Sequence, residues 1–248
     1  MNPVLDYSHD YDPDADFDRW FTKFTADRIR RWLRPPDRVL EMGAATGLMT
    51  AMIAPLVNSI TSVERSPAYV DKLRSRGLSN VAVHQGDAEN FSSDATFNHV
   101  VATSLFGNLS DQRRFLRNMR PLLSGGGLVH VTVNNPRSLH RLLAVEMGLI
   151  ASFHDLSAAN VRHGTRPFDR EEVERIAASA GFQVVHREGI LLKPLPNDAM
   201  ARLTDQLIEA LDRIAHHLDE YAAIQYFVLA RANAEGPPER SSPMCDRR

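Results

Sequence analysis

The stretch from Arg38 to Thr50 constrains the fold more than any other part of this sequence. Its apolar start contains the acidic Glu41, a loop with Gly43 and Gly47 follows, and an apolar-periodic segment comes next. This order predicts a strand, a tight glycine loop and a helix. Glycine suits such a loop because a residue without Cβ lets backbone N–H groups close on a ligand while the chain turns. The spacing is Glu-x-Gly-x-x-x-Gly, which differs from the Gly-x-Gly-x-x-Gly of dinucleotide loops.

Strand-like and helix-like patterns alternate along the rest of the chain. Apolar runs predict strands at residues 39–42, 59–64, 81–84, 97–103, 128–133, 182–192 and 223–230. Helical patterns separate the first five strands, and a long helix is expected over residues 197–220. Four βα units followed by a fifth strand indicate an α/β fold, with a doubly wound, mostly parallel sheet of seven strands and helices on both faces.

Three segments lie outside this alternation. Residues 1–36 are acidic and then helical, and they are expected to form an N-terminal arm and helix that cover the site. Residues 134–168 follow the fifth strand, and their helical and then irregular pattern predicts an inserted helical cap over the strand ends. Residues 233–248 are rich in Pro, Glu, Arg and Ser, which predicts a disordered tail. One ligand-binding domain is therefore expected over residues 37–232.

The composition is that of an ordinary globular domain, with 43% hydrophobic and 24% charged residues. A formal net charge of -2 argues against a nucleic-acid binder, whose domain would be basic. Cys245 is the one cysteine, and no cluster of His, Asp or Glu has ligand spacing, so neither disulfides nor a metal are expected. No apolar run approaches the roughly 20 residues of a membrane span. The acidic start does not resemble a signal peptide, so a cytoplasmic protein is expected.

Polar side chains stand where the predicted strands end. In a doubly wound sheet the ligand binds at the carboxyl ends of the strands. These ends carry Glu41, Glu64, Asp87, Thr103 and Ser104. Glu64 suits two ribose hydroxyls, because a carboxylate accepts both at once, and Asp87 with the Ala88 N–H suits an adenine edge. Each acid alone is equally well explained as a helix cap or a surface residue, but together they favour a cationic nucleoside over a pyrophosphate.

The loop and these acids resemble the first motifs of the class I S-adenosylmethionine (SAM) dependent methyltransferases. Their loop is usually written Asp/Glu-x-Gly-x-Gly-x-Gly, and Ala45 stands here in place of the middle glycine. The resemblance covers roughly residues 37–230 and implies a Rossmann-like, SAM-binding domain with SAM as cofactor. The cofactor contacts that it implies are Glu41, Gly43, Ala44, Gly47, Met49, Glu64, Arg65, Asp87, Ala88, Thr103 and Ser104.

Two further stretches, residues 138–149 and 191–197, resemble a group of bacterial methyltransferase-like proteins. That group usually carries a His-x-x-Glu-His stretch after the fourth strand. Residues 103–108 occupy that place here and contain neither His nor Glu. Two acid/base groups are therefore absent from the expected site.

Methyl transfer needs few catalytic groups, because a sulfonium is already activated and the enzyme mainly aligns the acceptor and excludes water. Tyr7 and Tyr11 are expected beside the sulfonium, and packing of the terminal arm explains them equally well. The candidates for a base are His140, His154 and His163, although a single histidine is more often structural. Arginines that suit an anionic group of the acceptor are Arg141, Arg162 and Arg166. The expected catalytic set is Tyr7, Tyr11, His140, His163 and Arg166.

The leading hypothesis is a methyltransferase that acts on O or N of a small molecule, with natural-product biosynthesis as one setting. Its acceptor is expected to carry a carboxylate or a phosphate. In the alternative, a SAM-consuming cyclase or lyase, SAM's own amine attacks Cγ, closes a ring and releases methylthioadenosine. A third hypothesis is a non-catalytic SAM-binding module or partner subunit. Neither nucleic acid nor a membrane is expected as a partner, and the oligomeric state is open, a homodimer included.

Overall fold

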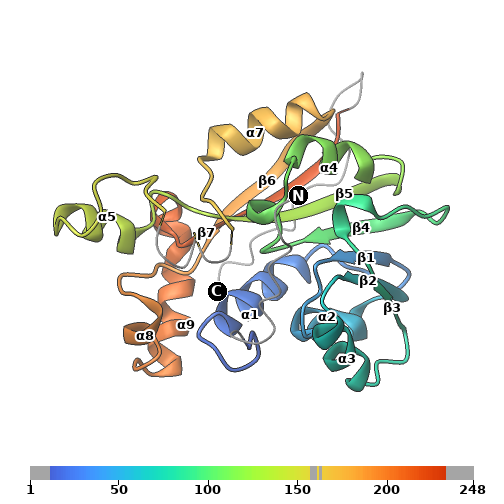
Figure 1. Ribbon diagram of the computed structural model, residues 1–248, viewed down its shortest axis with the longest axis horizontal. Helices are drawn as coiled ribbons and strands as arrows, with labels where there is room; N and C mark the ends of the chain where they lie inside the picture. Colours follow the sequence, from blue (N-terminus) through green and yellow to red (C-terminus); the bar gives the residue numbers. More distant parts are fainter. Residues whose placement is uncertain (1–11, 157–160, 162–163, 233–248) are drawn as a thin grey trace.

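The computed structural model describes residues 12–156, 161 and 164–232. Seven strands form one sheet in the order β3-β2-β1-β4-β5-β7-β6 (Figure 1). Their bounds are β1 (Arg38–Met42), β2 (Ser59–Glu64), β3 (Val81–Gln85), β4 (Phe97–Ala102), β5 (Leu123–Asn134), β6 (Phe182–Ile190) and β7 (Ile224–Arg231). The pairs among β1 to β5 are parallel, and β7 runs antiparallel to both β5 and β6. The predicted mostly parallel, seven-stranded α/β sheet is confirmed.

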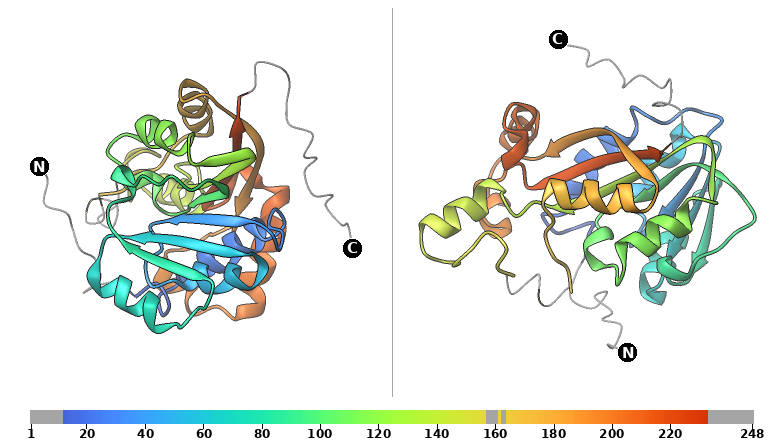
Figure 2. Two further views of the ribbon diagram at one scale, coloured as in Figure 1. Left: turned by 90° about the vertical axis from the view of Figure 1, so that its right-hand side faces the viewer. Right: turned by 90° about the horizontal axis from the view of Figure 1, so that it is seen from above.

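Helices cover both faces of the sheet. They are α1 (Arg19–Ile29), α2 (Leu48–Ile53), α3 (Pro67–Ser75), α4 (Gln112–Met119), α5 (Leu139–Glu146), α7 (Arg170–Ser179), α8 (Asn197–Met200) and α9 (Asp205–Ile214). Helices α4 and α7 lie over one face, as the view from above shows (Figure 2), and α1 and α2 pack on the opposite face. The sheet therefore separates two apolar layers.

Alternation along the strands explains these two layers. Neighbouring residues such as Val100 and Val101 in β4, or Phe227 and Val228 in β7, belong to opposite apolar clusters. Strand β7 is buried from Ile224 to Ala230, which agrees with its continuous apolar sequence. Strands β4 and β7 are thus covered on both faces, and the ligand site is left to the edge where the strands end.

Two local predictions are wrong in detail. The helix expected over residues 197–220 is divided into α8, α9 and short 3₁₀ turns, because the backbone is extended at Thr204, whose side chain accepts the Leu207 N–H at 3.4 Å. Strand β5 begins at Leu123, so Gly125 to Gly127 continue the strand across an irregular register with β4 and do not form a turn before it. Within the described residues, no helix has the length and apolar character required to span a bilayer.

Helix α5 follows β5 and projects at one end of the molecule (Figure 1). Arg141, which is 8% exposed, donates from Nε to the Phe153 carbonyl at 2.9 Å and from Nη2 to the Asp155 carbonyl. Its guanidinium therefore holds the chain after α5 against the helix. Because residues 157–160 and 162–163 lie outside the described part, the cap over the strand ends stays a prediction.

Candidate cofactor and acceptor site

The predicted polar residues gather along one edge of the sheet. Parallel pairing aligns Met42 with Val63 and Glu64 with Gln85, so strands β1, β2 and β3 end side by side. Strand β4 is parallel to β1 and ends at the same edge. The loop after β1, the Glu64 carboxylate and the turn at Asp87 are consequently neighbours in space.

The loop after β1 is held in an unusual backbone conformation. Gly43, Ala45 and Gly47 have φ angles of +74°, +47° and +80°. The Gly43 N–H donates to the Val63 carbonyl at 2.8 Å, which ties the loop to β2. Ala45 therefore occupies the left-handed region without the freedom of glycine, at the position where the methyltransferase motif has its middle glycine.

Glu64 ties this loop to the end of β2. Its Oε2 accepts the Ala45 N–H at 2.8 Å, and its Oε1 accepts the N–H groups of Arg65 and Ser66 at 2.8 and 2.9 Å. Glu64 is 7% exposed. A carboxylate has about four lone-pair positions, so three backbone donors leave it able to accept from a ligand hydroxyl. The side chain of Arg65 is exposed and contributes its backbone N–H here.

Glu41 lies deeper, between β1, β2 and α2. The hydroxyls of Thr50 and Ser62 donate to its Oε2 at 2.5 and 3.0 Å, and it is 3% exposed. Burial is the main cause that raises the pKa of Glu41 to about 7, against these two hydrogen bonds. The sequence pattern did not identify Thr50 and Ser62, because nothing local links either residue to Glu41. A group poised between its charged and neutral forms is suited to respond to a cation nearby.

We call the predicted polar residues at this edge of the sheet the rim residues. Those not yet described come from the turns after β3 and β4. Asp87 is exposed, and its Oδ1 accepts the Glu89 N–H at 2.8 Å, while Ala88 beside it is buried. Ser104 has a φ of +55°, and its N–H donates to the Thr132 hydroxyl at 2.8 Å. Asp87 thus keeps its second oxygen at the open edge.

Two other implied cofactor residues have packing roles. Met49 is 6% exposed and belongs to the apolar layer beneath α1. Ala44 is buried, and its N–H points to the Val63 carbonyl at 3.3 Å. Both support the loop from the side of the core.

The N-terminal arm reaches the same loop, a contact that the sequence did not predict by residue. Asp14 accepts from the Thr46 hydroxyl at 2.7 Å and from Arg76 Nη2 at 2.5 Å. Arg76 Nε also donates to the Thr46 carbonyl at 2.6 Å. The acidic composition of residues 12–18 was the one available signal. These three side chains connect the arm, the loop and α3.

The cap residues differ in what they contact. The Arg166 guanidinium forms an ion pair with Glu172 at 2.8 Å and lies 3.6 Å from the centre of the Phe168 ring. His154 contacts Asp169 at 2.7 Å, and Asp169 precedes α7 as its N-cap residue without a side-chain capping hydrogen bond. The predicted residues that lie outside the described part are Tyr7, Tyr11, Arg162 and His163.

His140 stands at the start of α5. Its backbone N–H donates to the backbone carbonyl of Lys193 at 3.0 Å. Burial, followed by the positive charges of Lys193 and Arg141, lowers the pKa of His140 to about 3. The imidazole is therefore neutral at physiological pH, and this low pKa makes it a weak base.

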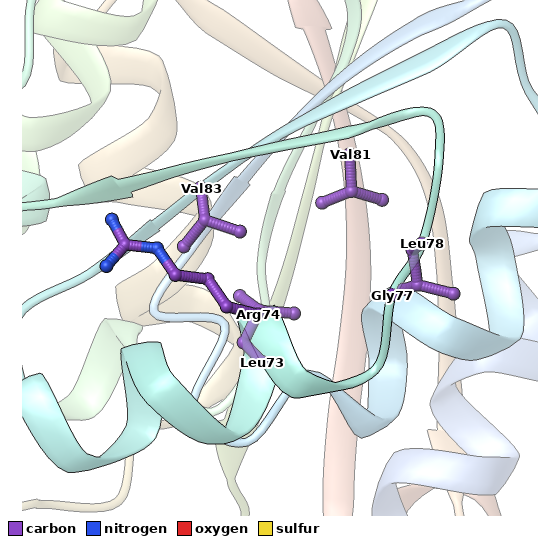
Figure 3. A pocket seen from close by; sticks show the side chains of 6 residues that line it. All are labelled: Leu73, Arg74, Gly77, Leu78, Val81 and Val83. Carbon is purple, nitrogen blue, oxygen red and sulfur yellow. The ribbon is translucent and has the colours of Figure 1, made fainter.

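Two cavities lie elsewhere on the molecule. One of about 260 Å³ lies between α3 and β3, where apolar side chains of Leu73, Leu78, Val81 and Val83 gather (Figure 3). Another of about 610 Å³ lies along α7 and β6. Neither is lined by the rim residues. Across the described ranges, no three His, Cys, Asp or Glu side chains are grouped to hold a metal ion.

Comparisons with known proteins agree with this geometry. The family described as "Methyltransferase domain" matches residues 16–187. A probable SAM-dependent methyltransferase of Mycobacterium tuberculosis is 29% identical over 201 residues, which cover 80% of this chain and 68% of that protein. Protein-L-isoaspartate O-methyltransferase of Pseudomonas paraeruginosa is 39% identical over 75 residues, or 28% of this chain. The matched part spans 36% of that relative's length.

Solved structures share the fold at low sequence identity. The putative methyltransferase in a complex with the Haloferax volcanii Trm112 activator superposes with a TM-score of 0.64 at 16% identity, covering 93% of this chain and 100% of that one. The N-methyltransferase NodS of Bradyrhizobium japonicum, solved with S-adenosylhomocysteine, gives 0.59 at 16% identity, covering 89% and 91%. Together with the family match, these findings show that the chain belongs to the class I SAM-dependent methyltransferase family and that its cofactor is SAM.

Proposed function

We propose that this protein transfers the methyl group of SAM to an oxygen or nitrogen atom of a small molecule, with natural-product biosynthesis as one setting. The observation that carries the proposal is the set of carboxylates along one edge of the sheet. Glu41 lies near the end of β1, Glu64 is the last residue of β2 and Asp87 follows β3, so the three acids come from the same ends of adjacent parallel strands. Three acids suit a cationic adenosyl compound and disfavour a nucleotide phosphate.

The residues present fit SAM in chemistry and in burial. Glu64 is fixed by three backbone N–H groups and retains capacity for a ribose hydroxyl. Asp87 is exposed at the rim, where it can accept from an adenine amino group while the Ala88 N–H donates. Glu41 supplies negative charge behind the loop, on the side where the amino group of SAM would lie.

SAM supplies a methyl group that is already activated by the positive sulfur. The chain's own residues then bind and orient the two reactants and exclude water from them. The loop of Gly43 to Gly47 is fixed by Glu64 on one side and by Asp14 on the other. An acceptor that is protonated at neutral pH needs a base, whereas an acceptor that is already deprotonated or neutral and nucleophilic does not. The low pKa of His140 favours an acceptor of the second kind.

A small acceptor is favoured over a macromolecule. The net charge of -2 argues against RNA, because domains that bind nucleic acid are usually basic. The isoaspartate methyltransferases act on protein by name, but their matches cover only 28% to 51% of this chain.

The test is turnover by the purified chain with SAM and a panel of small acceptors that carry an O or N nucleophile, followed by chromatography of the nucleoside product. Release of S-adenosylhomocysteine with a methylated product supports the proposal. Release of methylthioadenosine would instead assign the reaction to the SAM-consuming cyclase or lyase, and binding without turnover would indicate a SAM-binding module. One chromatogram therefore separates the three functions.

Binding of SAM tests the rim residues directly. Glu64→Ala and Asp87→Ala should each weaken SAM binding by about 1–3 kcal/mol, because each removes a charged hydrogen-bond acceptor. Asp94→Ala is the matched control, since this exposed carboxylate precedes β4 at the opposite end of the strand. Calorimetry that finds unchanged affinity in both rim variants would overturn the assignment of these carboxylates to the cofactor.

A further inference from the structure

Four polar side chains at the ends of β5 and β6 have no role in the cofactor site. Ser138 and His140 stand at the start of α5, Lys193 follows β6 and Asn197 is the first residue of α8. We call this group the Lys193 cluster. Strands β5 and β6 both run antiparallel to β7, so they are parallel to each other and end at the same edge as β1. The cluster therefore lies on the cofactor edge of the sheet.

The cluster contains buried polar atoms that no partner satisfies. Ser138 is 0% exposed, and its Oγ has no hydrogen-bond partner. His140 Nδ1 and Asn197 Oδ1 are also buried and also have no hydrogen-bond partner. A polar atom left unpaired in a protein interior costs about 1–3 kcal/mol, so native structures rarely keep several together without a ligand or water to satisfy them.

Lys193 is the one cation of the cluster. It is 7% exposed, and the described part of the chain gives its ammonium neither a hydrogen bond nor an ion pair. Burial lowers the pKa of Lys193 to about 8, while the nearby charges of Asp18 and Asp198 act in the opposite direction. Lys193 is consequently protonated at neutral pH. Asp18 itself accepts from Asn197 Nδ2 at 2.8 Å.

The N-terminal arm brings this cluster close to the SAM loop. Asp14 accepts from Thr46 in the loop, and Asp18 accepts from Asn197 in the cluster. Four residue steps separate the two acids, and an extended chain of that length spans at most about 14 Å. A small molecule can therefore extend from the Lys193 cluster to the methyl group held by the loop.

We propose that the Lys193 cluster binds a carboxylate of the methyl acceptor, with the Lys193 ammonium as its counter-ion and the Ser138 hydroxyl as a second donor. The inference rests on the proposed function, because it specifies the acceptor class of that same site. A carboxylate has acceptors for both donors, and it gives the buried ammonium a hydrogen-bonded partner in addition to the nearby charges of Asp18 and Asp198. Asn197 Oδ1 then accepts from an N–H or O–H group elsewhere on the acceptor.

Acetate is the simplest probe of this site, because it fits a carboxylate subsite whatever the rest of the acceptor is. The chain has three lysines, Lys23, Lys72 and Lys193. Reductive ¹³C-methylation keeps the charge of each and gives separate NMR signals, assigned with Lys→Arg variants. We expect acetate to shift the Lys193 signals saturably, with S-adenosylhomocysteine present, and acetamide to leave them unchanged. The Lys23 and Lys72 signals should not respond.

Calorimetry on unmodified protein gives the second measurement. Lys193→Met should weaken acetate binding by about 10- to 100-fold, as for loss of a charged hydrogen bond, and leave the affinity for S-adenosylhomocysteine unchanged. Lys23→Met is the matched control, since Lys23 pairs with Glu209 on the surface. Melting curves confirm that both variants fold.

Three results would overturn the proposal: equal responses to acetate and acetamide, unchanged acetate binding in Lys193→Met, or tighter binding of inorganic phosphate than of acetate. The failure of the proposed function has a different signature. If the proposed function fails, S-adenosylhomocysteine does not bind. The NMR response of Lys193 to acetate is then measured in the absence of S-adenosylhomocysteine, so that the carboxylate site is still tested.

Discussion

Glu41 shows how one buried carboxyl group makes stability depend on pH. Burial raises its pKa from 4.5 to about 7. Between these values the folded protein keeps a proton that the unfolded chain has released, so the free energy of unfolding falls as pH rises from 4.5 to 7. Above pH 7 the loss levels off at about 3 kcal/mol.

Glu41→Gln should remove this dependence, because an amide stays neutral. We expect the variant to match the wild type near pH 4.5 and to exceed its unfolding free energy by up to about 3 kcal/mol at pH 8. Urea unfolding at several pH values measures this. Glu146→Gln, at an exposed position, serves as control and should shift the profile little. A constant difference at all pH values would show that Glu41 does not titrate as described.

Ala45 carries backbone strain in the SAM loop. Its φ of +47° costs a non-glycine residue about 1 kcal/mol. Ala45→Gly should therefore keep or raise stability by up to about 1 kcal/mol. Ala44→Gly, one residue earlier and without a positive φ, should lower it by about 0.5–1 kcal/mol. Thermal unfolding of both variants measures these changes. If Ala45→Gly proved less stable than Ala44→Gly, the backbone strain at Ala45 would be contradicted.

At the scale of elements, the close approach of the loop to α3 depends on Gly47. A Cβ added there would clash with Leu73 Cδ1, whereas one added at Gly77 would meet nothing within 4 Å. Both glycines have positive φ angles, +80° and +62°. Gly47→Ala and Gly77→Ala therefore share the backbone cost and differ in the steric cost.

We expect Gly47→Ala to lose about 1–3 kcal/mol more stability than Gly77→Ala, because the buried Leu73 side chain of α3 must shift to admit the methyl group. Denaturant titration gives both values. The cofactor loop should also bind SAM more weakly in the Gly47 variant alone. Equal losses in the two variants would mean that α3 adapts without cost.

At the scale of the whole molecule, a buried hydrogen-bonded chain crosses the sheet. His99 in β4 contacts Asp37 at 3.2 Å and His130 in β5 at 2.9 Å, and His130 contacts the Tyr226 hydroxyl in β7 at 2.7 Å. Burial lowers the pKa of His130 well below its usual value and raises that of Tyr226. His130 and Tyr226 are thus held neutral, and the network joins strands that are far apart in sequence.

Tyr226→Phe should cost about 1–3 kcal/mol, because His130 Nδ1 loses its partner inside the core. Tyr221→Phe, at a partly exposed position, is the control and should cost less than about 0.5 kcal/mol. Chemical unfolding of the two variants compares them. A Tyr226→Phe variant as stable as wild type would show that the network contributes no net stability.

The local sequence determined most of the sheet and the edge that carries the site. Strand β2 was predicted at the residues where it lies, because alternation and apolar runs act over a few neighbouring residues. The order of acids at strand ends located Glu41, Glu64 and Asp87 for the same reason. The break at Thr204 was missed, since residues on either side of it have good helical periodicity.

Tertiary structure alone decided which distant side chains meet. Asp14 reaches Thr46 across 32 residues, and Asp18 reaches Asn197 across 179. No local pattern encodes such contacts, because they depend on how the arm packs over the sheet. By itself the sequence determined a doubly wound fold with acids at its strand ends. Packing decided that Glu64 and Asp14 hold the loop, and that the Lys193 side chain is buried near Asp18.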